Sequence, residues 1–387
     1  MKLRHTAIVA LALACGTAGA SAKELAFATF VSPTSTTVKE VLEPWIEWFN
    51  QNAGGDTTIK LYAGGTLGRS PAAQPKLLKD GVADLTIVVP SYYPGVYSDF
   101  DMFELPGLAR SSAEASGAAW QLYQDGQIEG LDDFKVVSIY TSAPYAVHST
   151  ADVKSVDDLK GLKIRAAGPV QTAVLTSLGA VPQAMSPTEM AENINRGLLD
   201  GAVADWSVAD SFKVMEVTDN HYNARLGVLP FVVAINSDVY EQLPPEARKA
   251  IDESGERLVK LQGDSFAKFE ADAIARTEAK EGQTVIQPTD EEIAIIRERT
   301  QPVRDEIVAK NGPEGLEAYE AILEKMRATC PRATDNRPES RHTGAVPAPR
   351  PLQSIGPQCS MKLKVVYRAY RGPAASSGSA ASSWSRS

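Results

Sequence analysis

The sequence predicts a two-lobed α/β protein in which each lobe is a mostly parallel sheet flanked by helices. Strands and helices are expected to alternate along most of the chain, and this order builds parallel sheets. Two patterns also occur once in each half of the chain. One is a strand that ends in glycine, and the other is a helix followed by glycine, aspartate and a strand. The repeated pairs are residues 58–65 with 162–168 and residues 77–89 with 194–206. Finally, two long β-rich stretches, residues 134–148 and 226–236, provide paired crossings that restrict two lobes to opening and closing.

Length and composition bound the class of protein. With 387 residues, the chain is long enough for two domains of ordinary size. Hydrophobic residues make up 43% and charged residues 22%, which is typical of a soluble globular protein. The net charge of −9 leaves no overall basic surface, so nucleic acid is not expected as a partner.

Residues 1–22 have the order of parts that marks a secretory signal peptide. A basic start at Lys2 precedes an apolar run, residues 6–15, that is too short to span a bilayer, and an A-x-A cleavage site at residues 20–22. The mature protein is therefore expected to be secreted and to begin at Lys23, with its signal peptide removed. The alternatives are a buried N-terminal helix and a lipoprotein anchored through Cys15.

The end of the chain differs from its body. Residues 331–387 are rich in Pro, Ser, Ala and Arg and have no acid after Glu339, so this tail is expected to be disordered and foreign to the fold. A basic tail that binds an acidic partner is the alternative. Because Cys330 and Cys359 lie at or beyond the end of the folded pattern, neither a disulfide framework nor a cysteine metal site is expected.

The first half is expected to contain three strands and two helices in alternation. The strands are residues 24–31, 57–62 and 84–90, and the helices are residues 38–50 and 74–80. The third strand delivers Ser91, Tyr92 and Tyr93 to a loop at its carboxyl end. Ligands of open α/β sheets bind at that end of the strands. The helix–glycine–aspartate–strand pattern that recurs in the second half is short and is common in unrelated β-α-β proteins. Coincidence is therefore the alternative to two similar halves.

The second half carries clear helix signals. A strand ends at Arg165, a helix opens at Gly168-Pro169, and residues 186–189 have the form of a capping box with proline at the first helical position. A polar helix over residues 247–281, interrupted at Gly263, would be about 50 Å long and would therefore lie across both lobes. Two further helices are expected at residues 290–310 and 314–327.

The crossings and the long helix divide the chain between the lobes. Lobe I is predicted to comprise residues 23–146 and 235–275. Lobe II is predicted to comprise residues 147–234 and 276–330. A ligand would then bind in the cleft between them.

Arg165 is the leading candidate for a binding residue. It stands at a strand end, four residues before the start of a helix whose amino terminus carries partial positive charge. An arginine suits a carboxylate because its planar guanidinium donates two parallel hydrogen bonds. The alternative is an ordinary surface arginine at the end of a strand.

Catalytic patterns are missing from the sequence. It has no H-E-x-x-H, no G-x-S-x-G, no phosphate-binding loop with its lysine and no G-x-G-x-x-G after a strand. Four histidines are present, of which His148 and His221 lie within the expected fold and have no partners at ligand spacing. An enzyme, a metal site and a cofactor are therefore not expected.

Three segments together resemble the periplasmic solute-binding proteins of TRAP transporters, the DctP-like family. They are DLKGLKIR at residues 158–165, the glycines and leucine of residues 168–180, and GLLDG at residues 197–201. The resemblance covers residues 23–330 and implies a periplasmic-binding-protein fold that closes on its ligand. It also implies that Arg165 forms a salt bridge with a ligand carboxylate. The implied partners are the small and large membrane subunits of an ion-driven secondary transporter.

The chain departs from this family at two places. Many relatives have Gln-Glu-Asn after the DG pair, where this chain has residues 202–206, so Asp205 or Trp206 is expected to face the cleft instead. Some relatives have a second arginine on the strand before the DLKG run, where this chain has Pro144 and Tyr145. Because a second arginine is not evident here, a simple C4-dicarboxylate is disfavoured as the ligand. The candidate pocket walls are aromatic, with core packing as the alternative for each. They are Tyr92, Tyr93, Tyr145, Trp206 and Phe231.

The function predicted from these observations is that of a periplasmic binding protein, expected to be a monomer, that captures a small organic acid for a TRAP transporter. The sequence leaves open whether this acid is a dicarboxylate, a keto acid, an aromatic acid or a sugar acid. Two alternatives are a periplasmic enzyme on the same scaffold and a binding protein of an ABC importer or signalling system.

Overall fold

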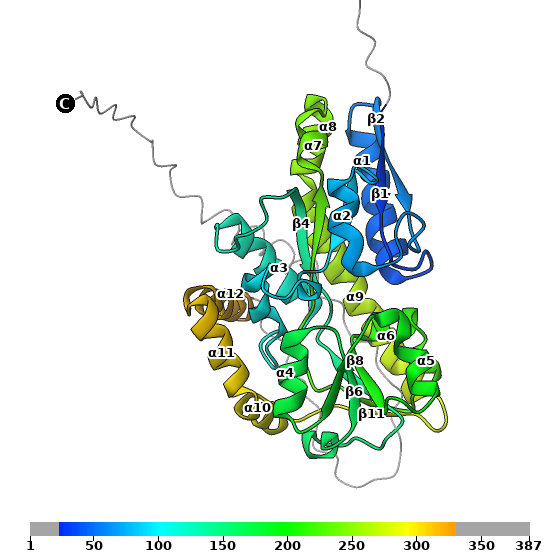
Figure 1. The fold of residues 1–387 in the computed structure, drawn as a ribbon, viewed down its shortest axis with the longest axis vertical. Helices are drawn as coiled ribbons and strands as arrows, with labels where there is room; N and C mark the ends of the chain where they lie inside the picture. The colour runs from blue at the N-terminus through cyan, green and yellow to red at the C-terminus, as the bar shows by residue number, and fades with distance from the viewer. Residues whose placement is uncertain (1–22, 330–387) are drawn as a thin grey trace, which may run out of the picture.

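The computed structural model describes residues 23–329, which form two sheets surrounded by helices (Figure 1). The predicted signal peptide, the predicted tail and all three cysteines lie outside the described residues. The two-lobed α/β architecture predicted from the sequence is confirmed, with one sheet in each lobe.

The first sheet has five strands in the order β2-β1-β3-β10-β4. They are β1 (Lys23–Ala28), β2 (Thr57–Tyr62), β3 (Leu85–Val88), β4 (Lys135–Thr141) and β10 (Pro230–Ile235). All four residues of β3 are buried, as expected for an apolar strand in the middle of a sheet that is covered on both faces. Helix α1 (Glu43–Asn52) covers this sheet, and the indole of its Trp45 donates a 2.8 Å hydrogen bond to Ser254.

The second sheet has six strands in the order β11-β9-β5-β8-β6-β7. They are β5 (Ala146–Ser149), β6 (Lys163–Ala166), β7 (Val181–Ala184), β8 (Gly201–Ala204), β9 (Asn220–Tyr222) and β11 (Thr284–Ile286). Strand β6 lies between β7 and β8 and pairs with both in parallel. The residue after β6 and the residue after β8 therefore emerge at the same edge of the sheet.

Both sheets contain antiparallel as well as parallel pairs: two of the four pairings in the first sheet and three of the five in the second are parallel. Strand β10 pairs antiparallel with β3 and β4, and β5 pairs antiparallel with β8 and β9. The cause is the way the chain crosses between sheets. A crossing strand enters its sheet from the other lobe and not through a covering helix, so the right-handed parallel connection is not imposed on it.

The two predicted crossings are present. The first runs from β4 in one sheet to β5 in the other, and the second runs from β9 back to β10. The sequence placed residues 230–234 in lobe II, whereas the whole of β10 pairs within the first sheet. The apolar run of residues 226–236 has no internal signal for the point where the chain enters that sheet, so the prediction set this boundary too late.

The described chain contains the following helices: α1 (Glu43–Asn52), α2 (Gln74–Lys79), α3 (Ser112–Gln124), α4 (Pro169–Ser177), α5 (Met190–Asn195), α6 (Trp206–Ser211), α7 (Ser237–Glu241), α8 (Pro245–Asp252), α9 (Ser254–Glu278), α10 (Asp290–Arg299), α11 (Gln301–Asn311) and α12 (Glu314–Thr329). A helical turn with π-type hydrogen bonds, Thr37–Leu42, precedes α1. Among residues 23–329, no helix combines the length and the apolar character that a membrane span requires.

The predicted long helix is two helices, and its break lies at Glu253 and not at Gly263. Helix α9 runs unbroken through Gly263 because that glycine serves packing: a Cβ there would lie 2.8 Å from the backbone of Ala113 in α3. A Cβ on Gly255 would lie 2.0 Å from the ring of Trp120. These glycines let α3 and α9 approach closely. As predicted, α9 contacts both lobes, touching β4 in one and α6 and β11 in the other.

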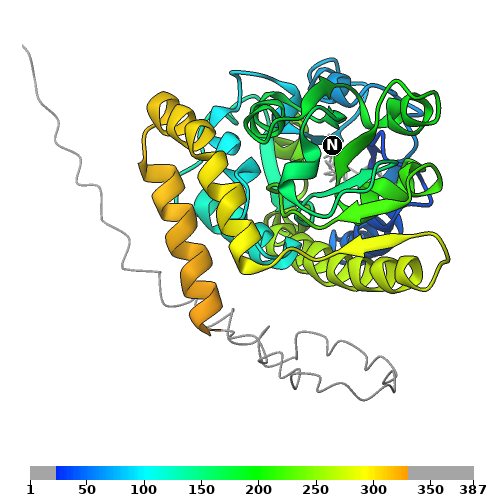
Figure 2. The same cartoon turned by 90° about the horizontal axis from the view of Figure 1, so that it is seen from below.

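The last helices were predicted as a pair in lobe II. Pro302 lacks a backbone donor and separates the first of them into α10 and α11. Helix α12 packs against α3, which covers β4 of the first sheet, while α11 packs against α4 of the second lobe (Figure 2). These three helices therefore lie along both lobes. Helix α3 was not predicted, because its apolar residues are mostly small alanines with little amphipathic contrast.

Candidate functional site

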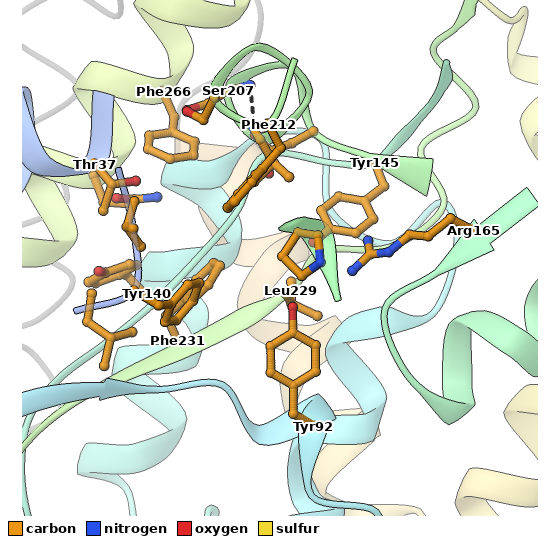
Figure 3. A pocket seen from close by; sticks show the side chains of 18 residues that line it. Thr37, Tyr92, Tyr140, Tyr145, Arg165, Ser207, Phe212, Leu229, Phe231 and Phe266 are labelled. Carbon is orange, nitrogen blue, oxygen red and sulfur yellow. Dashed lines mark hydrogen bonds between the residues drawn. The ribbon is translucent and has the colours of Figure 1, made fainter. Parts of the chain in front are cut away.

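A cavity lies between the two sheets, and the ends of strands from both reach it (Figure 3). The space between its lining residues, with the solvent that adjoins it, is about 620 Å³. Most of its lining is aromatic or aliphatic, with a few polar groups. The lining residues are Phe30, Val31, Thr37, Ile87, Tyr92, Tyr140, Tyr145, Arg165, Pro187, Asp205, Ser207, Val208, Ser211, Phe212, Leu229, Phe231, Gln262 and Phe266.

Arg165 reaches this cavity from β6, and only 1% of its surface is exposed. Two of its three guanidinium nitrogens are held by backbone carbonyls of neighbouring segments. Nε donates to the carbonyl of Met185 at 3.1 Å, and Nη1 donates to the carbonyl of Val203 at 3.2 Å. The third nitrogen, Nη2, is buried and has no hydrogen-bond partner among the described protein atoms. The guanidinium is thus fixed in place with one donor group left over.

The charge of Arg165 is not balanced by an ion pair. None of the salt bridges formed within residues 23–329 includes this arginine. Figure 3 shows its guanidinium between the rings of Tyr145 and Tyr92. Burial raises the pKa of the Tyr92 hydroxyl, and the nearby charge of Arg165 partly offsets that rise. A buried cation without a counter-charge is costly, so this position favours an anion from outside the chain.

Helix α4 begins shortly after Arg165, as predicted, with Gly168 as its N-cap and Pro169 in its first turn. The backbone of Gly168 is extended, with φ −156°, a conformation that any residue adopts. Glycine is required at this position because a larger residue would not fit. A Cβ would lie 2.6 Å from the carbonyl oxygen of Ser91, which follows β3 in the other sheet. The loops after β3 and β6 therefore meet at one edge of the cavity.

Asp205 follows β8 directly and is the N-cap of α6. Its Oδ1 accepts hydrogen bonds from the backbone N–H groups of Ser207 at 2.9 Å and Val208 at 3.1 Å. Its Oδ2 is buried, borders the same cavity and has no partner among the described protein atoms. Burial raises the pKa of this carboxyl to about 7, although the two N–H groups act in the opposite direction.

This raised pKa predicts how Asp205 affects stability as the pH changes. An unfolded aspartate ionises near pH 4, whereas Asp205 in the folded protein ionises near pH 7. Between these values the folded state holds a proton that the unfolded chain releases, so the free energy of unfolding falls as the pH rises. Asp205→Asn keeps the capping oxygen and has no charge. The variant is expected to gain about 2 kcal/mol relative to wild type between pH 5 and pH 8.

The measurement is thermal unfolding of both proteins at pH 5 and pH 8. Asp210→Asn is the matched control, because Asp210 is an exposed residue of the same helix. An advantage of D205N that is the same at both pH values would contradict the expectation.

Five of the seven predicted site residues lie together at the cavity: Tyr92, Tyr145, Arg165, Asp205 and Phe231. Tyr93 does not, although it is adjacent to Tyr92. Its hydroxyl donates to the carbonyl of Ala72 at 2.8 Å, and its ring packs edge-on against Tyr97. The turn over residues 90–92 points neighbouring tyrosines in different directions.

Trp206 also lies away from the cavity, inside the second lobe. Its indole N–H donates to Asn223 at 2.8 Å, and its ring packs edge-on against His148 at 5.1 Å between centroids. His148 and His221, which the sequence gave no partners, lie 2.8 Å apart between their Nδ1 atoms. Burial and the neighbouring His221 lower the pKa of His148 to about 3, so it is neutral at physiological pH and has a packing role.

Several lining residues were not predicted. Thr37, Tyr140, Gln262 and Phe266 come from the turn before α1, from β4 and from α9, which are far apart in the sequence. Tyr140, Gln262 and Phe266 fall within stretches that were predicted to be extended or helical, and Thr37 falls just before the predicted helix of residues 38–50. The spacing of Gln262 and Phe266, four residues apart on one helix face, was the one available signal. Within the described chain, no cluster of three or more metal-binding side chains occurs.

The sequence profile of bacterial extracellular solute-binding proteins, family 7, matches residues 27–311. A solute-binding protein of Sulfitobacter sp. strain NAS-14.1 is 24% identical over 295 residues, which cover 75% of this chain and 86% of that protein. These relatives bind solutes and are not enzymes, so the enzymatic alternative is excluded.

Solved structures of TRAP solute-binding proteins share this fold. A marine metagenome protein, described as specific for aromatic acids and solved with 3-hydroxybenzoate, has 26% identity and a TM-score of 0.74, covering 79% of this chain and 99% of its own. A Rhodoferax ferrireducens protein, solved with copurified benzoate, has 28% identity and a TM-score of 0.72, covering 78% and 98%. The chain therefore belongs to family 7 of the bacterial extracellular solute-binding proteins, the DctP-like binding proteins of TRAP transporters.

Proposed function

We propose that this protein captures an aromatic monocarboxylate in the periplasm and delivers it to the small and large membrane subunits of a TRAP transporter. The observation that carries the proposal is Nη2 of Arg165, a buried donor on a fixed cation that faces the cavity without a protein partner. A ligand carboxylate supplies both the missing acceptor and the missing negative charge. Charge-assisted bonds of this kind are about twice as strong as neutral hydrogen bonds.

The walls of the cavity favour an aromatic ligand. Aromatic side chains line much of the cavity: Tyr92 and Tyr145 lie next to Arg165, and Phe212 and Phe231 lie farther from it (Figure 3). They offer flat apolar surface against which a ring packs by stacking or by edge contact. The two similar solved structures bound to benzoate and 3-hydroxybenzoate are consistent with this class of ligand.

A dicarboxylate fits the same cavity less well. Among the described lining residues, Arg165 is the one cation, and the second charged group is the acid Asp205. A second ligand carboxylate would lack a counter-charge and would be repelled by an ionised Asp205. This charge distribution supports a ligand with a single carboxylate.

We also propose the assignment of chain segments to moving lobes. Lobe I is residues 23–146 and 230–275, and lobe II is residues 147–229 and 276–329, apart from the terminal helices that contact both. A monomer is sufficient for this role, because the cavity is formed within one chain. Closing and opening of the two lobes would then capture and release the ligand.

A small ligand panel tests the proposal by thermal unfolding. Benzoate and 3-hydroxybenzoate are expected to raise the melting temperature by about 5 °C at a hundredfold excess over Kd. Benzamide has the shape of benzoate without its charge and should give no shift, and succinate should give much less than benzoate. Equal shifts with benzamide and benzoate would show that the site does not select a carboxylate. A shift with succinate alone would replace the aromatic class by a dicarboxylate.

A further inference from the structure

The cavity has a second set of polar atoms at some distance from Arg165. The hydroxyl of Tyr140 and Oε1 of Gln262 are both buried, both belong to lining residues, and neither has a hydrogen-bond partner among the described protein atoms. Figure 3 shows Tyr140 beside Phe231 and Thr37, on the side of the cavity opposite Arg165. Both residues come from the first lobe, on β4 and α9, whereas Arg165 comes from the second.

The amide of Gln262 is oriented by its surroundings. Its Nε2 donates to the carbonyl of Thr141 at 3.2 Å, and the hydroxyl of Ser112 donates to the same oxygen at 2.8 Å. Only the NH₂ group of the amide can face a carbonyl oxygen, so the orientation with Oε1 toward Thr141 is excluded. The free Oε1 is therefore held as an acceptor, and no part of Gln262 is exposed.

Gln262 and Phe266 lie four residues apart on α9 and both line the cavity, so they share one face of that helix. Figure 3 places Phe266 on the same side as Tyr140 and Thr37. The carbonyl that holds Gln262 belongs to the residue after Tyr140. The two unpartnered oxygens are thus at the same end of an otherwise apolar space.

We propose that this end is a second recognition point, at which Gln262 Oε1 accepts a hydrogen bond from a hydroxyl on the ligand ring and the Tyr140 hydroxyl gives or receives another. A buried acceptor without a partner costs free energy, and a ligand hydroxyl removes that cost. The preferred ligand is then a hydroxylated aromatic acid that spans the cavity, its carboxylate at Arg165 on one lobe and its hydroxyl at Gln262 on the other. Such a ligand bridges the two lobes, and an unsubstituted ring does not. This inference rests on the proposed function and adds the feature that selects among aromatic acids.

The test compares matched ligands by isothermal titration: benzoate, 3-hydroxybenzoate, 4-hydroxybenzoate and the corresponding methoxybenzoates. At least one hydroxybenzoate is expected to bind wild type about tenfold or more tightly than benzoate, because its hydroxyl satisfies a buried acceptor. Methoxybenzoates donate no hydrogen bond and should lose that advantage. Equal affinity for methoxy and hydroxy ligands would overturn the proposal.

Two variants locate the effect. Gln262→Met keeps the length of the side chain and removes both its acceptor and the Nε2 donor to the carbonyl of Thr141, which keeps its hydrogen bond from Ser112. It should reduce the preference for the hydroxyl, measured as the ratio of the affinities for hydroxybenzoate and benzoate in the same variant, to about twofold or less. Tyr140→Phe removes only a hydroxyl that bonds nothing in the protein, so its fold is not at risk. A hydroxyl preference that survives in both variants, or that is lost in Asp205→Asn instead, would refute the assignment to Gln262 and Tyr140.

The two proposals fail in different ways. If wild type binds neither benzoate nor either hydroxybenzoate, the proposed function is wrong. The second recognition point is then wrong too, because it rests on that function. If wild type binds benzoate and both hydroxybenzoates equally well, the proposed function stands and the inference about Gln262 and Tyr140 is wrong.

Discussion

Replacing Arg165 by alanine is expected to weaken binding of benzoate and 3-hydroxybenzoate by about 100-fold or more, and to abolish the rise in melting temperature that they cause in wild type. The reason is that the variant leaves a ligand carboxylate buried without its cation. Removing one partner of a buried, hydrogen-bonded charge pair costs about 2–5 kcal/mol, and each 1.4 kcal/mol corresponds to a tenfold change in Kd. Titration calorimetry and thermal unfolding measure the two effects independently.

Two controls separate this effect from a loss of fold. Arg165 also donates to the carbonyls of Met185 and Val203, so the ligand-free alanine variant should be checked by circular dichroism and by its own melting temperature. Arg165→Lys keeps the charge and loses the planar donor pair, and is expected to bind with an intermediate affinity. A well-folded R165A protein with wild-type affinity for benzoate would remove Arg165 from the site.

Replacing Gly168 by alanine is expected to weaken ligand binding by about 30-fold or more while leaving each lobe folded. The added Cβ would lie 2.6 Å from the backbone oxygen of Ser91 in this structure, and a backbone atom cannot move aside as a flexible side chain can. Overlap of this kind costs about 2–3 kcal/mol. That strain exists only when the loops after β3 and β6 meet, so it reduces the population of the closed state that binds ligand.

Gly315→Ala is the matched control for this variant. Gly315 lies in α12, has an ordinary φ, and its added Cβ would make only ordinary contacts with the flexible side chain of Met102, with the sulfur at 3.6 Å. It should therefore bind ligand as wild type does. Small-angle scattering with saturating benzoate adds a direct readout: G168A should stay more extended than wild type. Equal affinity and equal compaction in both proteins would mean that the lobes do not close on this contact.

The sequence was most informative where a strong local pattern predicted both a strand and the residue at which that strand ends. Arg165 was predicted as a binding residue because a strand end and a Gly-Pro helix start stand four residues apart, and both lie where expected. Asp205 was proposed with Trp206 as the replacement for a family motif after the DG pair, and it lies directly after β8. Residues that directly follow parallel strands emerge at the same edge of a sheet, where ligands bind. Predicting the strands therefore also predicts which residues lie near the site.

Local patterns do not predict the direction in which a side chain points, as the aromatic residues show. Tyr92 and Tyr93 are neighbours of equal chemistry, and only the geometry of one turn decides that Tyr92 borders the cavity. Trp206 follows Asp205 directly, yet it points into the lobe because Asn223 and His148 supply its partners there. Those partners are distant in sequence, so no local pattern predicts the direction of the side chain.

Gln262 was missed for a different reason. It stands in a helix whose composition is polar, so a glutamine there carries no signal by itself. Its role depends on which face of α9 meets the cavity, and that face is set by glycines 255 and 263, which allow α3 to pack closely against the helix. Of these two glycines, Gly263 was interpreted as an interruption of the helix. Close packing between helices is a property of both partners, and the sequence of one does not reveal it.

The most direct test of the account is a crystal structure of the wild-type protein with benzoate. The account predicts that the carboxylate lies within hydrogen-bond distance of Nη2 of Arg165, with the ring between Tyr92, Tyr145 and Phe231 and its far edge toward Gln262. A benzoate bound in the reverse direction, or with its carboxylate on another cation, would contradict the claim that Arg165 is the anchor of this site.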